Sequence, residues 1–271
     1  MLKAILFDLD NTLLGNSMEA FIPAYFQALT RHAAHLIPPD RLIPELLRAT
    51  QAMEANDGDG PTNEETFAAV FYPALGYAPD ELEPLFEQFY AQEFPKLRPL
   101  TRTLPDARSL VEWALECGLQ VAIATNPLFP RTAIEQRLEW AGVPATEFEY
   151  ALVTSYEIMH ATKAHPAYYR ETCARLGRQP GECLMVGDDW ERDIAPAASV
   201  GIPVYWIAEP VEASPADDVT PVGQGTLTDL WKMVKSYDDT EQHVKVEWLP
   251  VGIEPKVDCH ANASLDHDQN P

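Results

Sequence analysis

The second half of the sequence alternates between short apolar segments and helical stretches. Helices are predicted at residues 106–117, 131–140, 166–176, 190–199 and 227–235, the first three with a glycine just beyond the last turn. Apolar strands are predicted between them at residues 119–125, 150–154, 183–186 and 203–207, and another opens the chain at residues 3–7. Strands that alternate with helices pair in parallel through right-handed crossovers. The sequence therefore predicts an α/β fold built on a parallel sheet.

Residues 16–100 interrupt this alternation with a block that is helical throughout. Apolar residues recur at helical spacing over residues 18–31, 41–56, 63–75 and 79–94, with turn residues between these stretches. We expect a helical domain inserted after the first strand, with hinges at residues 15–17 and 96–104. The sheet domain then comprises residues 1–15 and 101–235. Residues 236–271 are predicted to form an acidic, partly disordered tail.

The chain carries a formal net charge of −23. Nucleic acids and anionic membrane surfaces attract basic patches, so this charge argues against both as partners. No apolar run is long enough to span a membrane, and the first predicted strand leaves no room for a signal peptide. The four cysteines are scattered and form no CxxC pair, which is typical of a reducing compartment. We therefore expect a cytoplasmic protein.

Asp8 and Asp10 follow the first predicted strand, two residues apart. The period of a strand is also two, so both carboxylates can face one crevice at the carboxyl end of the sheet. One carboxylate can attack phosphorus while the other transfers the proton, if a cation limits their mutual repulsion. Taken alone, the two residues fit a surface turn after a buried strand equally well.

A second acidic group follows the strand at residues 183–186. Asp188 and Asp189 come directly after the strand, and Asp193 lies one helical turn further on. Carboxylate oxygens are hard ligands that suit Mg²⁺. The alternative is a helix N-cap with acidic residues in its first turn, which accounts for Asp189 and Glu191.

Polar residues follow two further strands. Thr125 and Asn126 precede a predicted helix, where they can bind an oxyanion or act as an ordinary N-cap. Lys163 follows the next strand and is the only lysine between Lys96 and Lys232. Because the net charge of the chain repels phosphate, a phosphate site would need a local lysine and a local cation. In an open parallel sheet the strand ends share one crevice, where ligands bind.

The order of these residues resembles that of the haloacid dehalogenase-like hydrolase superfamily. The resemblance spans about residues 1–235 and rests on one ordered set: Asp8-x-Asp10-x-Thr12, Thr125, Lys163 and Gly187-Asp188-Asp189-x-x-x-Asp193. It implies a Rossmann-like core with a mobile, all-helical cap inserted after the first motif. It also implies Mg²⁺-dependent phosphoryl transfer through an aspartyl-phosphate.

The resemblance gives each carboxylate a role. Asp8 would be the nucleophile and a metal ligand. Asp10 would protonate the leaving oxygen and then activate water, while its backbone carbonyl ligates Mg²⁺. Asp188 would complete the metal site, and Asp189 and Asp193 would orient metal-bound water and the site lysine.

The remaining members of the set would hold the substrate. Thr125 and Lys163 would bind the oxygens of the transferring phosphoryl group, and Thr12 and Asn126 would add to substrate binding. The sequence departs from the family pattern at Asn11, where many members have glycine. Asparagine tolerates a positive φ better than most residues, so we expect the turn to be kept.

The acid–base residue Asp10 favours a phosphate substrate, because the founding dehalogenases of the family do not use it. No lysine occurs between residues 11 and 95, which excludes the Schiff-base chemistry of the phosphonoacetaldehyde-type hydrolases. We therefore expect a phosphatase for a small phosphorylated metabolite. A sugar phosphomutase of the same family and a non-catalytic binding protein with the same fold are the alternatives. The oligomeric state is left open.

Specificity should come from the helical block. The candidates, chosen by position and polarity alone, are Asn16, Ser17, Tyr25, Arg31 and Arg102.

Overall fold

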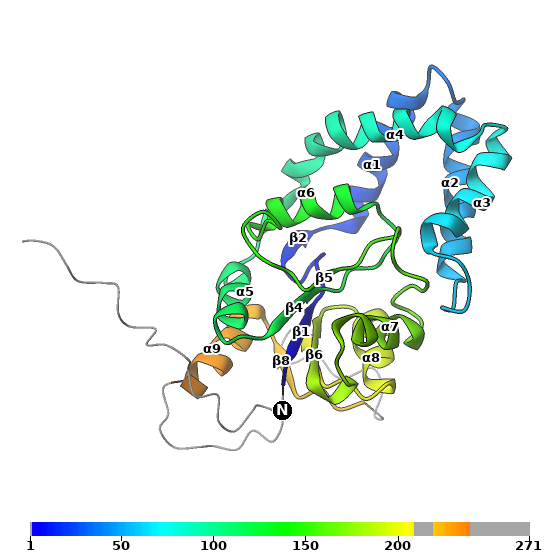
Figure 1. Ribbon diagram of the computed structural model, residues 1–271. Coiled ribbons are helices and arrows are strands. Elements are labelled where there is room, and N and C mark those ends of the chain that lie inside the picture. Colours follow the sequence, from blue (N-terminus) through cyan, green and yellow to red (C-terminus); the bar gives the residue numbers. More distant parts are fainter. Residues whose placement is uncertain (1, 209–218, 239–271) are drawn as a thin grey trace, which may run out of the picture.

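The computed structural model describes residues 2–208 and 219–238. A six-stranded sheet lies at its centre (Figure 1), and every pair of neighbouring strands in this sheet is parallel. The strand order is β5-β4-β1-β6-β7-β8. The strands are β1 (Ala4–Phe7), β4 (Gln120–Ile123), β5 (Leu152–Val153), β6 (Cys183–Gly187), β7 (Val204–Ile207) and β8 (Gly223–Gly225). The predicted α/β fold with a Rossmann-like parallel sheet is confirmed.

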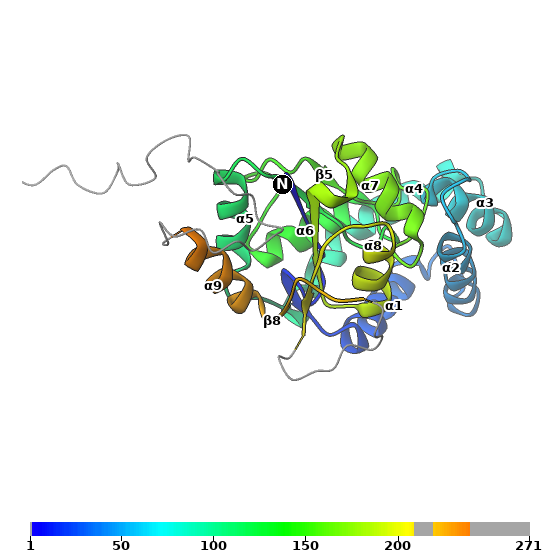
Figure 2. The same cartoon turned by 90° about the horizontal axis from the view of Figure 1, so that it is seen from below.

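Helices cover both faces of the sheet, and the strands are therefore apolar on both sides. In β1, Ile5 and Phe7 pack into one apolar cluster, whereas Ala4 and Leu6 pack into another. Helices α5 and α9 lie against one face and α7 and α8 against the other (Figures 1 and 2). The elements outside the sheet in this part of the chain are α5 (Ala107–Glu116), α6 (Arg131–Ala141), α7 (Pro166–Leu176), η2 (Pro180–Glu182), η3 (Trp190–Ile194), α8 (Ala195–Ser199) and α9 (Leu227–Asp238).

Four further helices lie beyond the carboxyl end of β1 (Figure 1). They agree with the predicted helical stretches to within a few residues. With the 3-10 segment that follows them, they are α1 (Met18–Ala33), α2 (Pro39–Glu54), α3 (Asn63–Leu75), α4 (Pro79–Gln92) and η1 (Phe94–Leu100). The division of the chain into a sheet domain and a helical domain stays a prediction.

The ends of α3 follow from local sequence. The hydroxyl oxygen of Thr62 accepts from the amide of Glu65 at 3.2 Å, and the Glu65 carboxylate accepts from the Thr62 amide at 3.0 Å. This capping box fixes the first turn, which starts at Asn63. Gly76 ends the helix in a left-handed conformation with φ 82°.

Both predicted hinges contain short strands. β2 (Leu14–Asn16) and β3 (Thr101–Thr103) pair in an antiparallel ribbon, with Gly15 opposite Arg102. A Cβ on Gly15 would lie 2.6 Å from Cγ of Arg102, so glycine allows the arginine to cross the ribbon. The sequence predicts hinges and no strands here, because three residues are too few to show an alternating pattern.

Strand β8 was also not predicted. Its sequence, Gly-Gln-Gly, has no β-branched or aromatic residue to indicate a strand. A Cβ on Gly223 would lie 2.7 Å from the ring of Tyr205, so the edge of the sheet accepts only glycine at this position.

Helix α9 includes the first three residues of the predicted tail and ends at Asp238. The rest of that tail lies outside the described residues. Among the helices that are described, none is both long enough and apolar enough to cross a membrane.

Candidate active site

Three neighbouring strands deliver polar residues to the same edge of the sheet. Asp8 follows β1, Thr125 lies just beyond β4, and Asp188 follows β6. β4 and β6 flank β1, and the amide of Asp8 donates to the carbonyl oxygen of Val186 at 2.9 Å. The strand ends therefore bring together residues that are far apart in the sequence.

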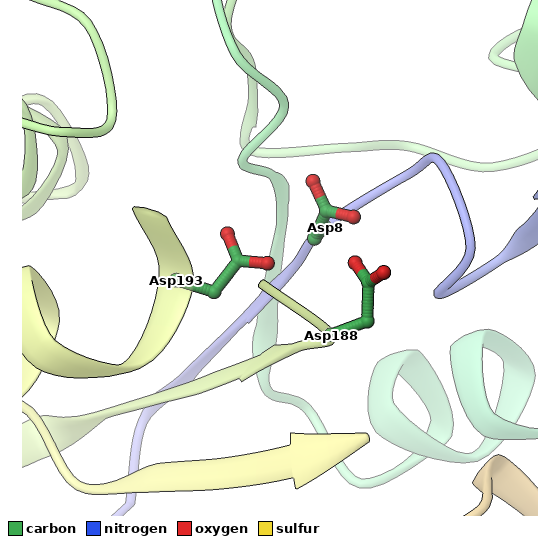
Figure 3. A group of neighbouring side chains, drawn as sticks. All are labelled: Asp8, Asp188 and Asp193. Atoms are coloured by element: carbon green, nitrogen blue, oxygen red, sulfur yellow. The ribbon is translucent and has the colours of Figure 1, made fainter. Parts of the chain in front are cut away.

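Asp8, Asp188 and Asp193 point toward a common space (Figure 3). One carboxylate oxygen from each lies within 4.8 Å of the others. Asp8 is 6% exposed and Asp193 is 1% exposed. Burial raises the pKa of Asp188 to about 8 and that of Asp193 to about 7, and the charge of Asp8 adds to both shifts. This acidic group therefore favours a cation, and carboxylate oxygens are ligands that Mg²⁺ prefers.

Gly187 allows Asp193 to join this group. A Cβ on Gly187 would lie 2.6 Å from Cβ of Asp193. Asp189 faces a different set of partners, because its carboxylate accepts from the amides of Glu191 at 2.9 Å and Arg192 at 3.0 Å. These contacts are those of the helix N-cap that was the alternative interpretation of the sequence.

Lys163 supplies the positive charge next to the acidic group. Its Nζ donates to Oδ1 of Asp8 at 2.6 Å and also pairs with Asp193, and the residue is 2% exposed. Burial disfavours the charged amine, but the carboxylates of Asp193 and Asp8 outweigh it and raise the pKa of Lys163 above its ordinary value. Burial raises the pKa of Asp8 as well, although Lys163 opposes that shift. One ammonium group thus pairs with two of the three carboxylates in the group.

Three of the predicted substrate-binding residues, Thr125, Asn126 and Lys163, lie in two connected loops, and Thr12 lies in the turn after β1. Oδ1 of Asn126 accepts from the backbone amide of Lys163 at 3.2 Å. Thr125 is buried, and its carbonyl oxygen accepts from the hydroxyl of Tyr168 at 3.0 Å. Thr12 is buried too, and its hydroxyl has no hydrogen-bond partner among the described residues. The structure brings Thr125, Asn126 and Lys163 together.

Asp10 lies in the turn after β1, where Asn11 has the positive φ of 62° expected for this position. The carboxylate of Asp10 accepts from Nδ2 of Asn16 at 2.9 Å and pairs with Nη1 of Arg137 at 2.5 Å. It does not belong to the group of three carboxylates described above. The metal contact implied for Asp10 by the family resemblance concerns its backbone carbonyl.

Arg137 is the neighbour of Asp10 that the sequence analysis missed. It is 1% exposed, and its guanidinium carbon lies 4.8 Å from the centroid of the Phe129 ring. Its Nε and Nη2 have no hydrogen-bond partner among the described residues. A signal was available, because Arg137 lies on the apolar face of its helix, three residues after Ile134. An arginine at such a position is rarely buried unless it is paired.

Replacing Arg137 by methionine should destabilise the protein. The substitution keeps a long side chain but removes the charged partner of Asp10, which still accepts from Asn16. We expect the free energy of unfolding to fall by about 1.5–3 kcal/mol, the usual contribution of a hydrogen bond to a charged group. Urea denaturation, monitored by circular dichroism, measures this difference in the free energy of unfolding.

The control for this variant is Arg131→Met on the same helix, whose ion pair with Glu135 is exposed at both ends. Exposed pairs contribute little, so this variant should unfold close to the wild type. Equal stability of the two variants would show that the buried pair does not stabilise the fold.

The five specificity candidates differ in their surroundings. Asn16 contacts Asp10, and Tyr25 lines a cavity between the helices. The other three, Ser17, Arg31 and Arg102, are exposed.

The sequence profile of the haloacid dehalogenase-like hydrolases matches residues 2–201. The chain belongs to this family. The hydrolase is 27% identical over 246 residues to the phosphoserine phosphatase of Thermus thermophilus, in an alignment that covers 79% of this chain and 94% of the relative. It is 28% identical over 211 residues to the N-acetylmuramic acid 6-phosphate phosphatase of Pseudomonas aeruginosa, in an alignment that covers 74% of this chain and 79% of the relative. The family indicated by the order of the motifs is confirmed.

Solved structures share the fold of this hydrolase. A 2-haloacid dehalogenase from Pseudomonas syringae superposes with a TM-score of 0.62 and 21% identity, and the match covers 88% of this chain and 100% of the other. At this identity the likeness concerns the fold alone.

Proposed function

We propose that this hydrolase is a phosphatase that cleaves the phosphomonoester of a small metabolite, with Asp8 as the nucleophile. The observation that carries the proposal is the 2.6 Å contact between Asp8 and Lys163 beside two further carboxylates. An anionic nucleophile must approach an anionic phosphate, and a fixed ammonium group offsets that repulsion. Both relatives named above are phosphatases, which supports the same class of reaction.

The reaction has two steps. An oxygen of Asp8 attacks phosphorus and forms a new O–P bond, while the bond between phosphorus and the ester oxygen breaks. Asp10 gives its proton to the departing alkoxide. Water then attacks phosphorus, Asp10 takes a proton from it, and the bond to Asp8 breaks to release inorganic phosphate. The contacts of Asp10 with Asn16 and Arg137 hold its carboxylate in one orientation, which supports its part as the proton acceptor of the second step.

The helical block is proposed to be the cap of this active site, comprising residues 16–100 over a core of residues 1–15 and 101–235. Its contacts with the loops of the site support this division. Nδ2 of Asn63, at the start of α3, donates to the carbonyl oxygens of Pro127 and Ala161, each at 3.2 Å. Pro127 is next to Asn126, and Ala161 is two residues before Lys163. The block therefore rests on both loops proposed to bind the phosphoryl oxygens.

A divalent cation fits the acidic group, whose three carboxylates are hard oxygen donors facing a single lysine. We propose that Asp8, Asp188 and the backbone carbonyl of Asp10 hold Mg²⁺. When bound, Mg²⁺ would neutralise charge on the phosphate oxygens. Asp193 pairs with Lys163 and so orients the lysine.

Removal of divalent ions tests this proposal. After treatment with EDTA and dialysis, hydrolysis of phosphomonoesters should fall at least tenfold, and added Mg²⁺ should restore it. Sodium chloride of equal ionic strength is the control and should restore nothing. The melting temperature should rise with Mg²⁺ as well, because a ligand that binds only the folded state stabilises it. A rate that is unchanged by EDTA would remove Mg²⁺ from the proposal.

The product separates the proposed hydrolysis from its alternatives. A phosphatase releases inorganic phosphate in step with the loss of ester. A sugar phosphomutase would instead return the phosphate at a second position of the sugar, and a binding protein would leave the ester intact. Phosphorus NMR of the reaction mixture distinguishes the three outcomes.

A further inference from the structure

A cavity of about 260 Å³ lies between the helical block and the sheet domain. Its walls come from α1, α2, α3 and α4, which Figure 1 shows beyond the carboxyl end of the sheet. Its floor comes from residues 128–130, which follow Thr125 and Asn126, and from Tyr156, just beyond β5. The floor therefore belongs to the loops that follow β4 and β5, next in sequence to the proposed phosphate-binding residues Thr125 and Asn126.

The lining of this cavity is apolar and rich in aromatic rings. Eight of its fifteen described lining residues are aromatic, and none of the fifteen is charged. The hydroxyls of Tyr25 and Tyr90 bond to each other at 3.0 Å. Burial raises the pKa of Tyr25 to about 12, so this hydroxyl stays neutral at physiological pH. A charged ligand group would find no ionic partner on these walls.

Arg137 connects the cavity with the acid–base residue. Its guanidinium lies on the ring of Phe129, which lines the cavity, and its Nη1 pairs with Asp10. Its positive charge also acts on the hydroxyls of Tyr25 and Tyr90. The cavity wall at Phe129 is thus linked to Asp10 through a single side chain, that of Arg137.

We infer that the cavity binds the alcohol part of the substrate, and that this part is an uncharged aromatic or branched aliphatic group. The inference rests on the proposed phosphatase function and adds the class of substrate. Its size follows from the volume, since a protein cavity of about 150 Å³ holds one benzene ring. A cavity of about 260 Å³ has room for one ring and a short side chain. Charged alcohols such as serine and glycolate would lose their hydration there without compensation.

The experiment compares initial rates on phosphate esters of alkyl alcohols. We expect kcat/KM for 2-phenylethyl phosphate and 3-methylbutyl phosphate to exceed that for phosphoserine and phosphoglycolate by roughly a hundredfold, since each methylene in an apolar pocket is worth at least tenfold. Acetyl phosphate is the control, because its acetyl group is too small to fill the cavity and its hydrolysis therefore measures phosphoryl transfer without a contribution from the cavity. If acetyl phosphate is hydrolysed but kcat/KM for the charged esters equals that for the apolar ones, the inference about the cavity is overturned and the proposed phosphatase function stands. If no compound is hydrolysed, the proposed function falls and the inference with it.

Three variants, one of them a control, test whether the preference arises in the cavity. Thr50→Lys places a charge on the wall formed by α2 and should lower the kcat/KM ratio of 2-phenylethyl phosphate to acetyl phosphate at least tenfold. Gln51→Lys adds the same charge at the next, exposed residue of α2 and should leave that ratio unchanged. Phe67→Ala enlarges the cavity and should raise the ratio of 2-(1-naphthyl)ethyl phosphate to 2-phenylethyl phosphate about fivefold or more. This third variant decides the question if Thr50→Lys fails to fold. Unchanged ratios would show that the alcohol binds elsewhere.

Discussion

Asp8→Asn should abolish phosphate release. The amide cannot form the bond to phosphorus, whereas its size and shape match the carboxylate. We expect kcat to fall by roughly 10⁴- to 10⁶-fold, the scale seen when a covalent nucleophile is removed. The fold should survive, because Lys163 keeps its second partner, Asp193. Phosphate release measured under single-turnover conditions gives the loss, and circular dichroism reports the fold.

The matched control for this variant is Asp80→Asn, which makes the same chemical change in the exposed first turn of α4. Its turnover should equal that of the wild type. Mass spectrometry after rapid quenching adds an independent test, since the wild type should gain one phosphoryl group on the peptide that contains Asp8. Retained phosphatase activity in the Asp8 variant would refute Asp8 as the nucleophile.

Lys163→Met should impair both turnover and stability. The ammonium group offsets negative charge at the nucleophile, and loss of one such stabilising group typically lowers kcat by about 10²- to 10³-fold. It also leaves two buried carboxylates without their cation, and removing one partner of a buried ion pair costs about 3–5 kcal/mol. The lower end of this range is expected here, because Asp193 already has a raised pKa and can take up a proton.

Lys96→Met serves as the control for this variant. Lys96 pairs with Glu93 at 2.6 Å, but the pair is exposed, so neither turnover nor stability should change. Urea denaturation and initial rates measured on the same preparations separate the two effects. A stable but slow Lys163 variant would assign the lysine to catalysis alone. A variant as active as the wild type would remove it from the proposed mechanism.

The strands that could be predicted are those that are buried on both faces, because burial requires a continuous run of apolar or small residues. β1 and β6 are covered on both faces, so every residue in them is apolar or small, and such runs stand out. Because the carboxyl ends of parallel strands meet at one edge of a sheet, the sequence alone predicts that Asp8, Thr125 and Asp188 lie at the same edge. This reasoning accounts for Asp8 and Asp188 in the acidic group, whereas Asp193 joins them from η3.

The elements that escaped prediction are defined by partners distant in the sequence. β2 and β3 are strands only because they pair with each other across the inserted helices. β8 pairs with β7 at a place where Gly223 packs closely against Tyr205, and the sequence of β8 alone does not indicate this contact. The pairing of Arg137 with Asp10 likewise depends on how α6 packs against the turn after β1, and the spacing of residues carries no information about that.

Asn63 joins the helical block to two loops at once. Its single amide group donates to the carbonyl oxygens of Pro127 and Ala161. A displacement that lifts the start of α3 away from these two loops would therefore break both bonds together. The two loops that we propose to bind the phosphoryl group would then lose their shared link to α3 in a single event, so the ordering of both loops depends on the position of this helix.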